Sequence, residues 1–214
     1  MTVSVLSISA RGDSEIAVTF ELRKGELRQK ECFLLSASVF ADLHLTVGEC
    51  DRDTFDTVSE AAELYRATKK GLSLLGYGTA SQKALYRKLV MKGFSKDIAQ
   101  KAASELSENG FINENSDAVR EAERCVVKLW GKKRIVAHLR SKGYSDESIR
   151  EAIYSLEDNG IDFAELCAER LEKTTDSLPC DPKEMQKLVA SLMRYGFSGG
   201  EIKEAIKSFQ VNNR

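Results

Sequence analysis

The side chains of this sequence that could do chemistry are mostly cations, and they gather in two stretches that contain no acid. Residues 64–96 hold eight Lys or Arg residues, and residues 128–142 hold six. Removing these fourteen positive charges from the formal net charge of −1 leaves −15 on the rest of the chain. Interspersed charges of both signs would be an ordinary solvated surface, so this segregation indicates a surface that meets a polar partner.

The densest part of the second stretch is Gly131-Lys132-Lys133-Arg134, where packing of the following Ile135 does not require three cations. A polyanion, an acidic protein surface and a merely solvated face are all compatible with this segment. The cations of the two stretches that we expect to contact a partner are Arg87, Lys88, Lys92, Lys132, Lys133, Arg134, Arg140 and Lys142.

Catalytic chemistry has little support in the sequence. His44 and His138 are the only histidines, and neither has a plausible metal ligand at helical spacing. There is no phosphate-binding loop, no dinucleotide-binding glycine motif and no Gly-x-Ser-x-Gly nucleophile motif. Acidic pairs such as Glu121/Glu123 and Glu157-Asp158 fit solvated helix surfaces. We therefore expect no enzyme, no cofactor and no metal site.

Composition sets the class of protein. The five cysteines are scattered, and they form no Cys-x-x-Cys or Cys/His cluster, which favours free thiols over a disulfide frame or a zinc site. No apolar run approaches the ~18–20 residues of a membrane span, and no basic-then-apolar stretch of the sequence resembles a signal peptide. We expect a cytoplasmic protein with no membrane partner.

Residues 135–160 show which elements position the second basic stretch. Apolar residues recur every three or four positions and are interrupted once, which predicts two amphipathic helices joined by a tight turn. Gly143 suits the left-handed position that ends the first helix. Ser145 can cap the second helix, and Tyr144 and Ile149 occupy the two positions of a hydrophobic staple.

This Gly-aromatic-Ser turn occurs three times, at residues 93–95, 143–145 and 196–198, with the glycines 50 and 53 residues apart. A repeat of about this period implies an elongated, stacked array of helices. Each serine-capped helix start could hold a phosphate through its backbone N–H groups. The turn, the cap and the staple account for every residue without a ligand, so we favour the structural interpretation.

A further helix precedes each helix pair. Periodicity predicts a first long helix from about Thr57, a linking helix within residues 115–130 and another within residues 162–173. Pro182 would stand near the start of the third pair. Each repeat therefore has three helices, about nine in all.

The first 36 residues differ, because apolar and polar side chains alternate in two runs and a third short run covers residues 31–35. We expect a small antiparallel sheet, followed by a short helix or loop in residues 37–57. The predicted fold class is mainly α, with tandem three-helix repeats and a small N-terminal antiparallel β extension. The predicted parts are residues 1–56 for the β-hairpin or meander extension, and 57–110, 111–159 and 160–214 for repeats 1, 2 and 3.

The order and spacing of the three repeats resemble the RecX family over roughly residues 60–209. The segments that carry the resemblance are residues 84–94, Leu106–Ile112, Gly131–Gly143 and Leu188–Phe197, the last with the family's Leu-xxx-Leu-xxx-Gly-Phe ending. The N-terminal strands are similar to the extension of the longer members. This chain departs from the family where the second repeat opens, because Asp117 stands where members often carry an aromatic residue.

The resemblance implies a modulator of the RecA recombinase, built as a curved array of three-helix repeats without an active site. Members of the family lie in the groove of the RecA–DNA filament and usually restrain strand exchange and co-protease activity. The resemblance assigns a filament-contacting role to the segment Lys132-Lys133-Arg134. Two alternatives stay open: a helical protein that binds DNA directly through its basic repeats, and a scaffold for another protein. A monomer is the default expectation.

Overall fold

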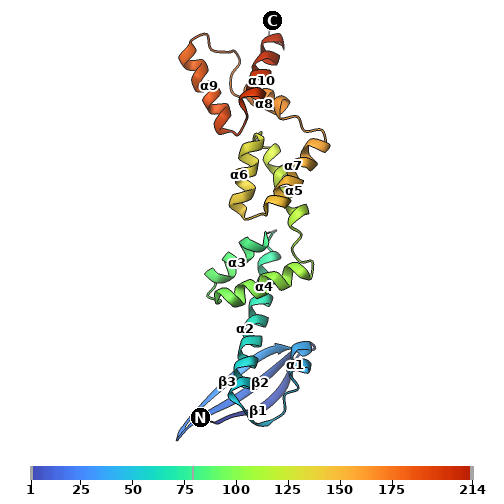
Figure 1. The fold of residues 1–214 in the computed structure, drawn as a ribbon, viewed down its shortest axis with the longest axis vertical. Helices are drawn as coiled ribbons and strands as arrows, with labels where there is room; N and C mark the ends of the chain where they lie inside the picture. The colour runs from blue at the N-terminus through green and yellow to red at the C-terminus, as the bar shows by residue number, and fades with distance from the viewer. Residues whose placement is uncertain (1, 79, 213–214) are drawn as a thin grey trace. The chain divides into compact units, whose positions relative to one another are not determined.

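The computed structural model describes residues 2–78 and 80–212, which belong to two compact units. The N-terminal unit comprises Met1–Thr79 and Leu85–Ile112, and the C-terminal unit comprises Ala80–Ala84 and Asn113–Arg214. The described residues form four strands and ten helices, so the predicted fold class, mainly α with a small antiparallel sheet, is confirmed (Figure 1). None of the helices in this described part is both long enough and apolar enough to cross a lipid bilayer.

The N-terminal unit begins with an antiparallel sheet whose strand order is β3-β2-β1-β4. Its elements are β1 (Thr2–Arg11), β2 (Glu15–Lys24), β3 (Leu27–Ser36), α1 (Ala37–Leu43) and β4 (Gly48–Cys50). Of the two predicted arrangements, hairpin or meander, the meander is present, but β3 is longer than the expected run of residues 31–35. The prediction also missed β4, because three residues are too few to show an alternating pattern and only pairing with β1 defines this strand.

The long helix α2 (Arg52–Leu75) covers this sheet and supplies the packing that a small sheet requires. Its Phe55 ring meets the rings of Phe20 and Phe33 edge to face, with centroids 5.2 and 5.4 Å away. This is a favourable geometry for aromatic pairs. The sheet and the first half of α2 therefore share one core.

Helix α2 starts earlier than the predicted Thr57. The Asp51 carboxylate caps it by accepting a hydrogen bond from the Thr54 backbone N–H at 2.7 Å. Asp51 and Asp53, which we assigned to a short helix or loop, are thus the cap and part of the first turn, where negative charge is favourable. The predicted boundary between residues 56 and 57 falls inside α2, and the division into three repeats stays a prediction.

Two further helices, α3 (Gln82–Met91) and α4 (Lys96–Glu108), pack on the second half of α2. Gly71 of α2 is buried there, and a Cβ on it would lie 2.5 Å from the Leu106 Cδ1 atom. A residue without a side chain is what allows α4 to approach α2 this closely.

The described residues of the C-terminal unit form six complete helices around one core. These helices are α5 (Glu114–Val126), α6 (Lys132–Lys142), α7 (Asp146–Asp158), α8 (Phe163–Glu172), α9 (Pro182–Arg194) and α10 (Gly199–Asn212). Pro182 stands in the first turn of α9, as predicted.

The predicted geometry of the Gly-aromatic-Ser turns is confirmed. Gly93, Gly143 and Gly196 have φ values of +94, +89 and +97°, in the region that favours glycine. The Ser145 hydroxyl caps α7 by accepting a hydrogen bond from the Ser148 backbone N–H at 3.1 Å. These local rules fix the direction of the chain between paired helices, and so they fix where the cations of α3 and α6 lie.

Candidate partner-binding surfaces

Most cations of α6 are already paired within the C-terminal unit. Three of the predicted partner-binding residues form ion pairs there, namely Lys132 with Glu157 at 2.6 Å, Arg140 with Asp146 at 3.1 Å and Lys142 with Glu121 at 3.7 Å. The acids come from the neighbouring helices α5 and α7. These cations therefore hold helices together as well as facing solvent.

Arg134 is held by aromatic rings. Its guanidinium carbon lies 4.1 Å from the centroid of Trp130 and 4.9 Å from that of Tyr195. Cations at this distance from a ring face are attracted by its electron density. Arg134 and Trp130 are half-buried, so this cation belongs to the packing between α6 and the end of α9.

The start of α6 is joined to the turn after α9 through the backbone. Gly131 N–H donates to the Tyr195 carbonyl at 2.8 Å, and Lys133 N–H donates to the Gly196 carbonyl at 3.1 Å. There is no room for a side chain at Gly131, where a Cβ would lie 2.4 Å from the Gly196 carbonyl carbon. The glycine that precedes the cations is therefore required by this joint, a role that the sequence alone did not reveal.

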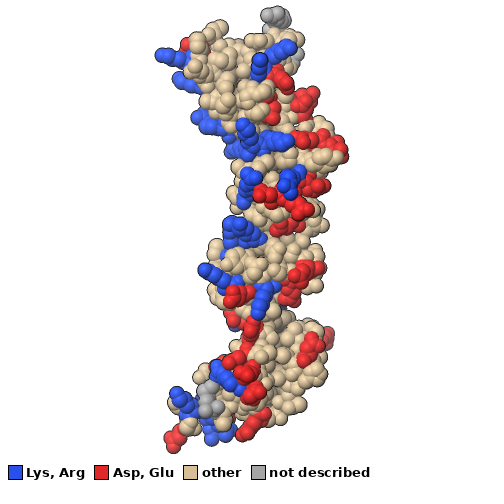
Figure 2. Space-filling view, viewed as in Figure 1, with Lys and Arg blue, Asp and Glu red and all other residues tan. Residues whose placement is uncertain are grey.

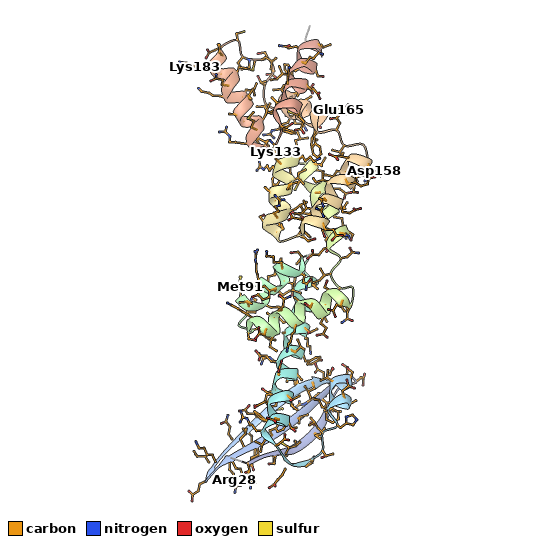
Figure 3. The ribbon with its side chains drawn as sticks, viewed as in Figure 1. Arg28, Met91, Lys133, Asp158, Glu165 and Lys183 are labelled. Carbon is orange, nitrogen blue, oxygen red and sulfur yellow. The ribbon has the colours of Figure 1, made fainter. Side chains whose placement is uncertain are left out.

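Lys133 is the predicted α6 cation that has no acidic or aromatic partner among the described residues. Its side chain is exposed, and the described residues offer it no ion pair or ring contact. Figure 2 shows Lys and Arg gathered over α6 and α9 of the C-terminal unit, and Asp and Glu over α7 and α8. Lys133 lies on the first of these sides, with Lys183, while Asp158 and Glu165 lie on the other (Figure 3).

We expected Glu121 to be a solvated acid on a helix surface, and this expectation is wrong. Its side chain is only 14% exposed, and its carboxylate lies 2.8 Å from the Nε2 atom of His138 and 3.7 Å from the Nζ atom of Lys142. The hydrogen bond with His138, together with the nearby cations of Lys142 and Arg124, lowers the pKa of Glu121. His138 is thus half-buried and positioned by a carboxylate in the packing of α5 against α6.

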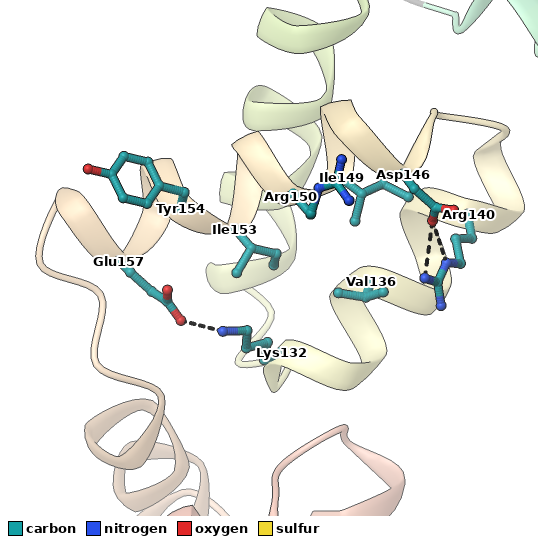
Figure 4. Close-up of a pocket in the computed structure, with 9 residues that line it drawn as sticks. All are labelled: Lys132, Val136, Arg140, Asp146, Ile149, Arg150, Ile153, Tyr154 and Glu157. Carbon is teal, nitrogen blue, oxygen red and sulfur yellow. Dashed lines mark hydrogen bonds and ion pairs between the residues drawn. The ribbon is translucent and has the colours of Figure 1, made fainter.

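A hollow of about 470 Å³ lies between α6 and α7 (Figure 4). The side chains of Val136, Ile149 and Ile153 line it, and Tyr154 stands beside it with 64% of its surface exposed. The ion pairs Lys132–Glu157 and Arg140–Asp146 stand at its two ends. The hollow can accept an apolar side chain but offers few free charges. The sequence analysis did not predict it, because only the packing of α6 against α7 brings its lining residues together.

The predicted cations of α3 and of the turn that follows it behave differently. Arg87, Lys88 and Lys92 are exposed, and within the described residues none of them forms an ion pair. They belong to the N-terminal unit, whereas the α6 cations belong to the C-terminal unit. The eight predicted residues therefore form two separate groups, and their role in binding stays a prediction.

No cluster of three His, Cys, Asp or Glu side chains that could hold a metal occurs in residues 2–78 and 80–212. Burial raises the pKa of the Cys167 thiol to about 12, so at neutral pH this cysteine is a core residue and not a nucleophile.

Comparison with known proteins identifies the family, although no family model matches the chain. The Regulatory protein RecX of Chlorobaculum tepidum is 32% identical over 143 residues, which is 66% of this chain and 86% of that protein. This chain belongs to the RecX family. A second RecX, from Pelodictyon phaeoclathratiforme, is 30% identical over 141 residues, or 64% of this chain and 84% of that protein. These relatives are named as regulatory proteins, which agrees with a non-enzymatic role.

Solved RecX structures share the fold. A crystal structure of regulatory protein RecX aligns with a TM-score of 0.73 at 20% identity and covers 94% of this chain and 99% of the other. The RecX structure from Lactobacillus salivarius aligns with a TM-score of 0.59 at 22% identity, over 70% of this chain and 97% of the other.

Proposed function

We propose that this RecX family member is a cytoplasmic regulator of RecA that binds the RecA filament on DNA and inhibits its recombinase and co-protease activities. It would act in DNA repair and recombination and in the SOS response, as a monomer without a cofactor. Membership of the family supports the regulatory role. The observation in the structure that supports a contact with the filament is the cationic surface of α3 and the turn after it, where Arg87, Lys88 and Lys92 are exposed and pair with no acid among the described residues.

The mechanism we propose is occupancy of the filament groove. A filament of protein on DNA carries a strong negative potential, and exposed cations without an internal partner gain the most from meeting it. A chain of three-helix repeats that lies in the groove would bridge neighbouring RecA subunits, and it would block access of a second DNA or of a repressor. Lys133 would contribute from α6 for the same reason.

The paired cations of α6 should contribute less. Lys132, Arg140 and Lys142 would have to give up a carboxylate to meet the filament, and Arg134 would have to leave two aromatic rings. The primary binding set is therefore Arg87, Lys88, Lys92 and Lys133, with the remaining predicted residues secondary.

The test is charge reversal on α3. The variant Arg87→Glu/Lys88→Glu should require about tenfold more protein for half-inhibition of RecA ATPase and strand exchange, because attraction becomes repulsion. The matched control is Arg28→Glu/Lys30→Glu on β3, which changes the same charge at exposed positions of the same unit. Circular dichroism should show unchanged helicity in both variants. Equal inhibition by the wild type and the α3 variant would count against this site, and absence of any inhibition by the wild type would reject the function.

Direct binding of DNA is the second candidate, because neither basic stretch contains an acid. Binding through phosphates releases counterions and weakens steeply with salt. Affinity should therefore be measured across a salt series for single-stranded DNA, for RecA alone and for the RecA–DNA filament. Preference for the filament supports our proposal, whereas equal affinity for naked DNA favours the second candidate.

A further inference from the structure

A basic hollow in the N-terminal unit is not accounted for by the contacts described so far. It has a volume of about 430 Å³ and lies where α2 meets the turn between α3 and α4. The residues that line it are Arg66, Lys69, Lys70, Ser73, Lys92 and Phe94. Four of the six are cations and none is an acid. Among the described residues an acid pairs only with Lys69, through the Glu15 carboxylate at 2.6 Å, and the Arg66 guanidinium carbon lies 5.6 Å from the centroid of the Phe94 ring.

The matching place in the C-terminal unit contains an acid. Each unit has two buried small residues, four positions apart, on the helix before the pair: residues 67 and 71 on α2, and 118 and 122 on α5. Aligning them places Lys70 at the position of Glu121, and aligning the turn glycines places Lys92 at the position of Lys142. Glu121 and Lys142 form an ion pair at 3.7 Å. In the N-terminal unit the same two positions carry like charges, which repel unless an anion comes between them.

The turn beside this hollow also has unused backbone acceptors. In the C-terminal unit the turn carbonyls receive a helix start: Ser81 Oγ donates to the Lys142 carbonyl at 2.9 Å, and Gly131 N–H donates to the Tyr195 carbonyl. The equivalent carbonyls of Lys92 and Gly93 accept no hydrogen bond from the described residues.

The surface around this turn is open. A Cβ on Gly93 would have no atom within 4 Å, whereas one on Gly143 or Gly196 would meet the docked helix start. Phe94 is half-buried, although Tyr144 and Phe197 at the equivalent positions are 8% and 1% exposed. Met91, at the end of α3, is 82% exposed and projects from the unit (Figure 3). The first turn therefore has the backbone conformation of the other two, and none of the described residues docks a helix start on it.

We propose that this hollow docks the start of a helix from the protein component of the filament, with a small capping residue and an acidic first turn. The free N–H groups of the helix start would donate to the Lys92 and Gly93 carbonyls, as those of Gly131 and Lys133 donate to the Tyr195 and Gly196 carbonyls. A carboxylate of the first turn would lie between Lys70 and Lys92, where Glu121 lies in the second unit. A small cap is required because Ser81 and Gly131 hold this position in the two occupied joints.

The unused carbonyls favour a helix start over nucleic acid. The phosphodiester backbone supplies acceptors and no N–H donors, so it could satisfy the cations but not Lys92 and Gly93. A helix start supplies both the donors and, through its first turn, the negative charge.

The inference rests on the proposed function and is tested with RecA filaments on single-stranded DNA, beside naked single-stranded DNA. Lys70→Glu places an acid where the C-terminal unit carries Glu121. This internal acid would pair with Lys92 in place of the partner's carboxylate, so the variant should bind the filament about tenfold more weakly. Its matched control is Lys183→Glu on α9, an exposed position without an ion pair in the described residues. Ser73→Arg fills the hollow and adds a cation, so it should also weaken filament binding while leaving DNA binding unchanged or stronger.

The outcomes separate the possibilities. Weaker filament binding by Lys70→Glu and Ser73→Arg, with Lys183→Glu close to wild type, supports the joint. Unchanged or stronger filament binding by Ser73→Arg would mean that a polyanion occupies the hollow, and it overturns the helix start. If neither variant differs from wild type, the docking site is rejected and the proposed function stands. If the wild type does not bind the filament, both are rejected.

Discussion

Helices α3 and α6 each precede a Gly-aromatic-Ser turn, are both basic, and use their charges in opposite ways. On α6, Lys132, Arg140 and Lys142 pair with acids of the same unit, and Arg134 is stacked on aromatic rings. On α3, neither Arg87 nor Lys88 has such a partner in the described residues, and the same holds for Lys92 in the turn that follows. The same basic pattern therefore stabilises the array in one place and remains available to a partner in the other.

The largest expected effect compares two turns. The start of α6 at Gly131 docks on the turn at Gly196, whereas the turn at Gly93 is open. Gly131→Ala should destabilise the C-terminal unit by about 3 kcal/mol, because the new Cβ meets backbone that cannot move aside. Trp130, the only tryptophan, lies in this unit, so its fluorescence during urea unfolding measures the loss.

Gly93→Ala is the control for this prediction. It places a Cβ in open space and incurs only the strain of a positive φ, about 1–2 kcal/mol, in the N-terminal unit. The Trp130 transition should therefore stay at the wild-type urea concentration. A larger shift of that transition in Gly93→Ala than in Gly131→Ala would contradict the assignment of the occupied joint.

The next effect concerns the two arginines. Arg134→Ala should cost about 1–2 kcal/mol, since both the ring contacts and the packing of the aliphatic stem are lost. Arg87→Ala should stay within about 0.5 kcal/mol of wild type, as is usual for an exposed position without a partner. Thermal unfolding followed by circular dichroism compares the two, and equal losses would show that α3 is not the free face.

The part of this arrangement that could be predicted from the sequence is the local part. A glycine with positive φ, a serine cap and an apolar staple each depend on residues within five positions, and all were confirmed at Gly143-Tyr144-Ser145. Family membership followed from the order of three such turns. The start of α2 was missed because Asp51 is equally consistent with a loop and with a cap until the helix is seen.

Pairing of charges could not be predicted, because it depends on how helices pack. Lys132 and Glu157 are 25 positions apart, and Glu121 reaches Lys142 from another helix. From the sequence alone, all four of these residues would be taken for solvated surface charges. Only the packing of α5 and α7 on α6 shows which cations are neutralised, and this changed the predicted binding set more than any other observation.

The third prediction concerns the acid that neutralises α6. Glu121→Gln should cost about 1 kcal/mol at pH 7, because a charged hydrogen bond with His138 and the attraction of Lys142 are lost. The pKa of Glu121 is lowered in the folded chain, so its stabilising effect is present above its ordinary value of 4.5 and is lost as pH falls through the lowered pKa. The wild type and the variant should therefore converge in acid, as urea unfolding between pH 7 and pH 3 would show. The control is Glu123→Gln at an exposed neighbouring position, whose free energy of unfolding should differ little from that of the wild type at any pH. If the difference between Glu121→Gln and the wild type is the same at every pH, the ionic role of Glu121 is contradicted.

The smallest expected effect has the opposite sign. Lys70→Glu places an acid where α5 carries Glu121, so it should stabilise α2 and α3 by about 0.5 kcal/mol through pairing with Lys92. Lys70→Gln removes only the repulsion and should gain less. Amide hydrogen exchange of α2 and α3, followed by mass spectrometry, measures both changes. Faster exchange in Lys70→Glu would show that Lys70 and Lys92 do not face each other as Glu121 and Lys142 do. A variant that is more stable than wild type, yet binds the filament more weakly, cannot owe its defect to unfolding. The unpaired cations of the N-terminal unit would then cost stability in the free protein because they are kept for a partner.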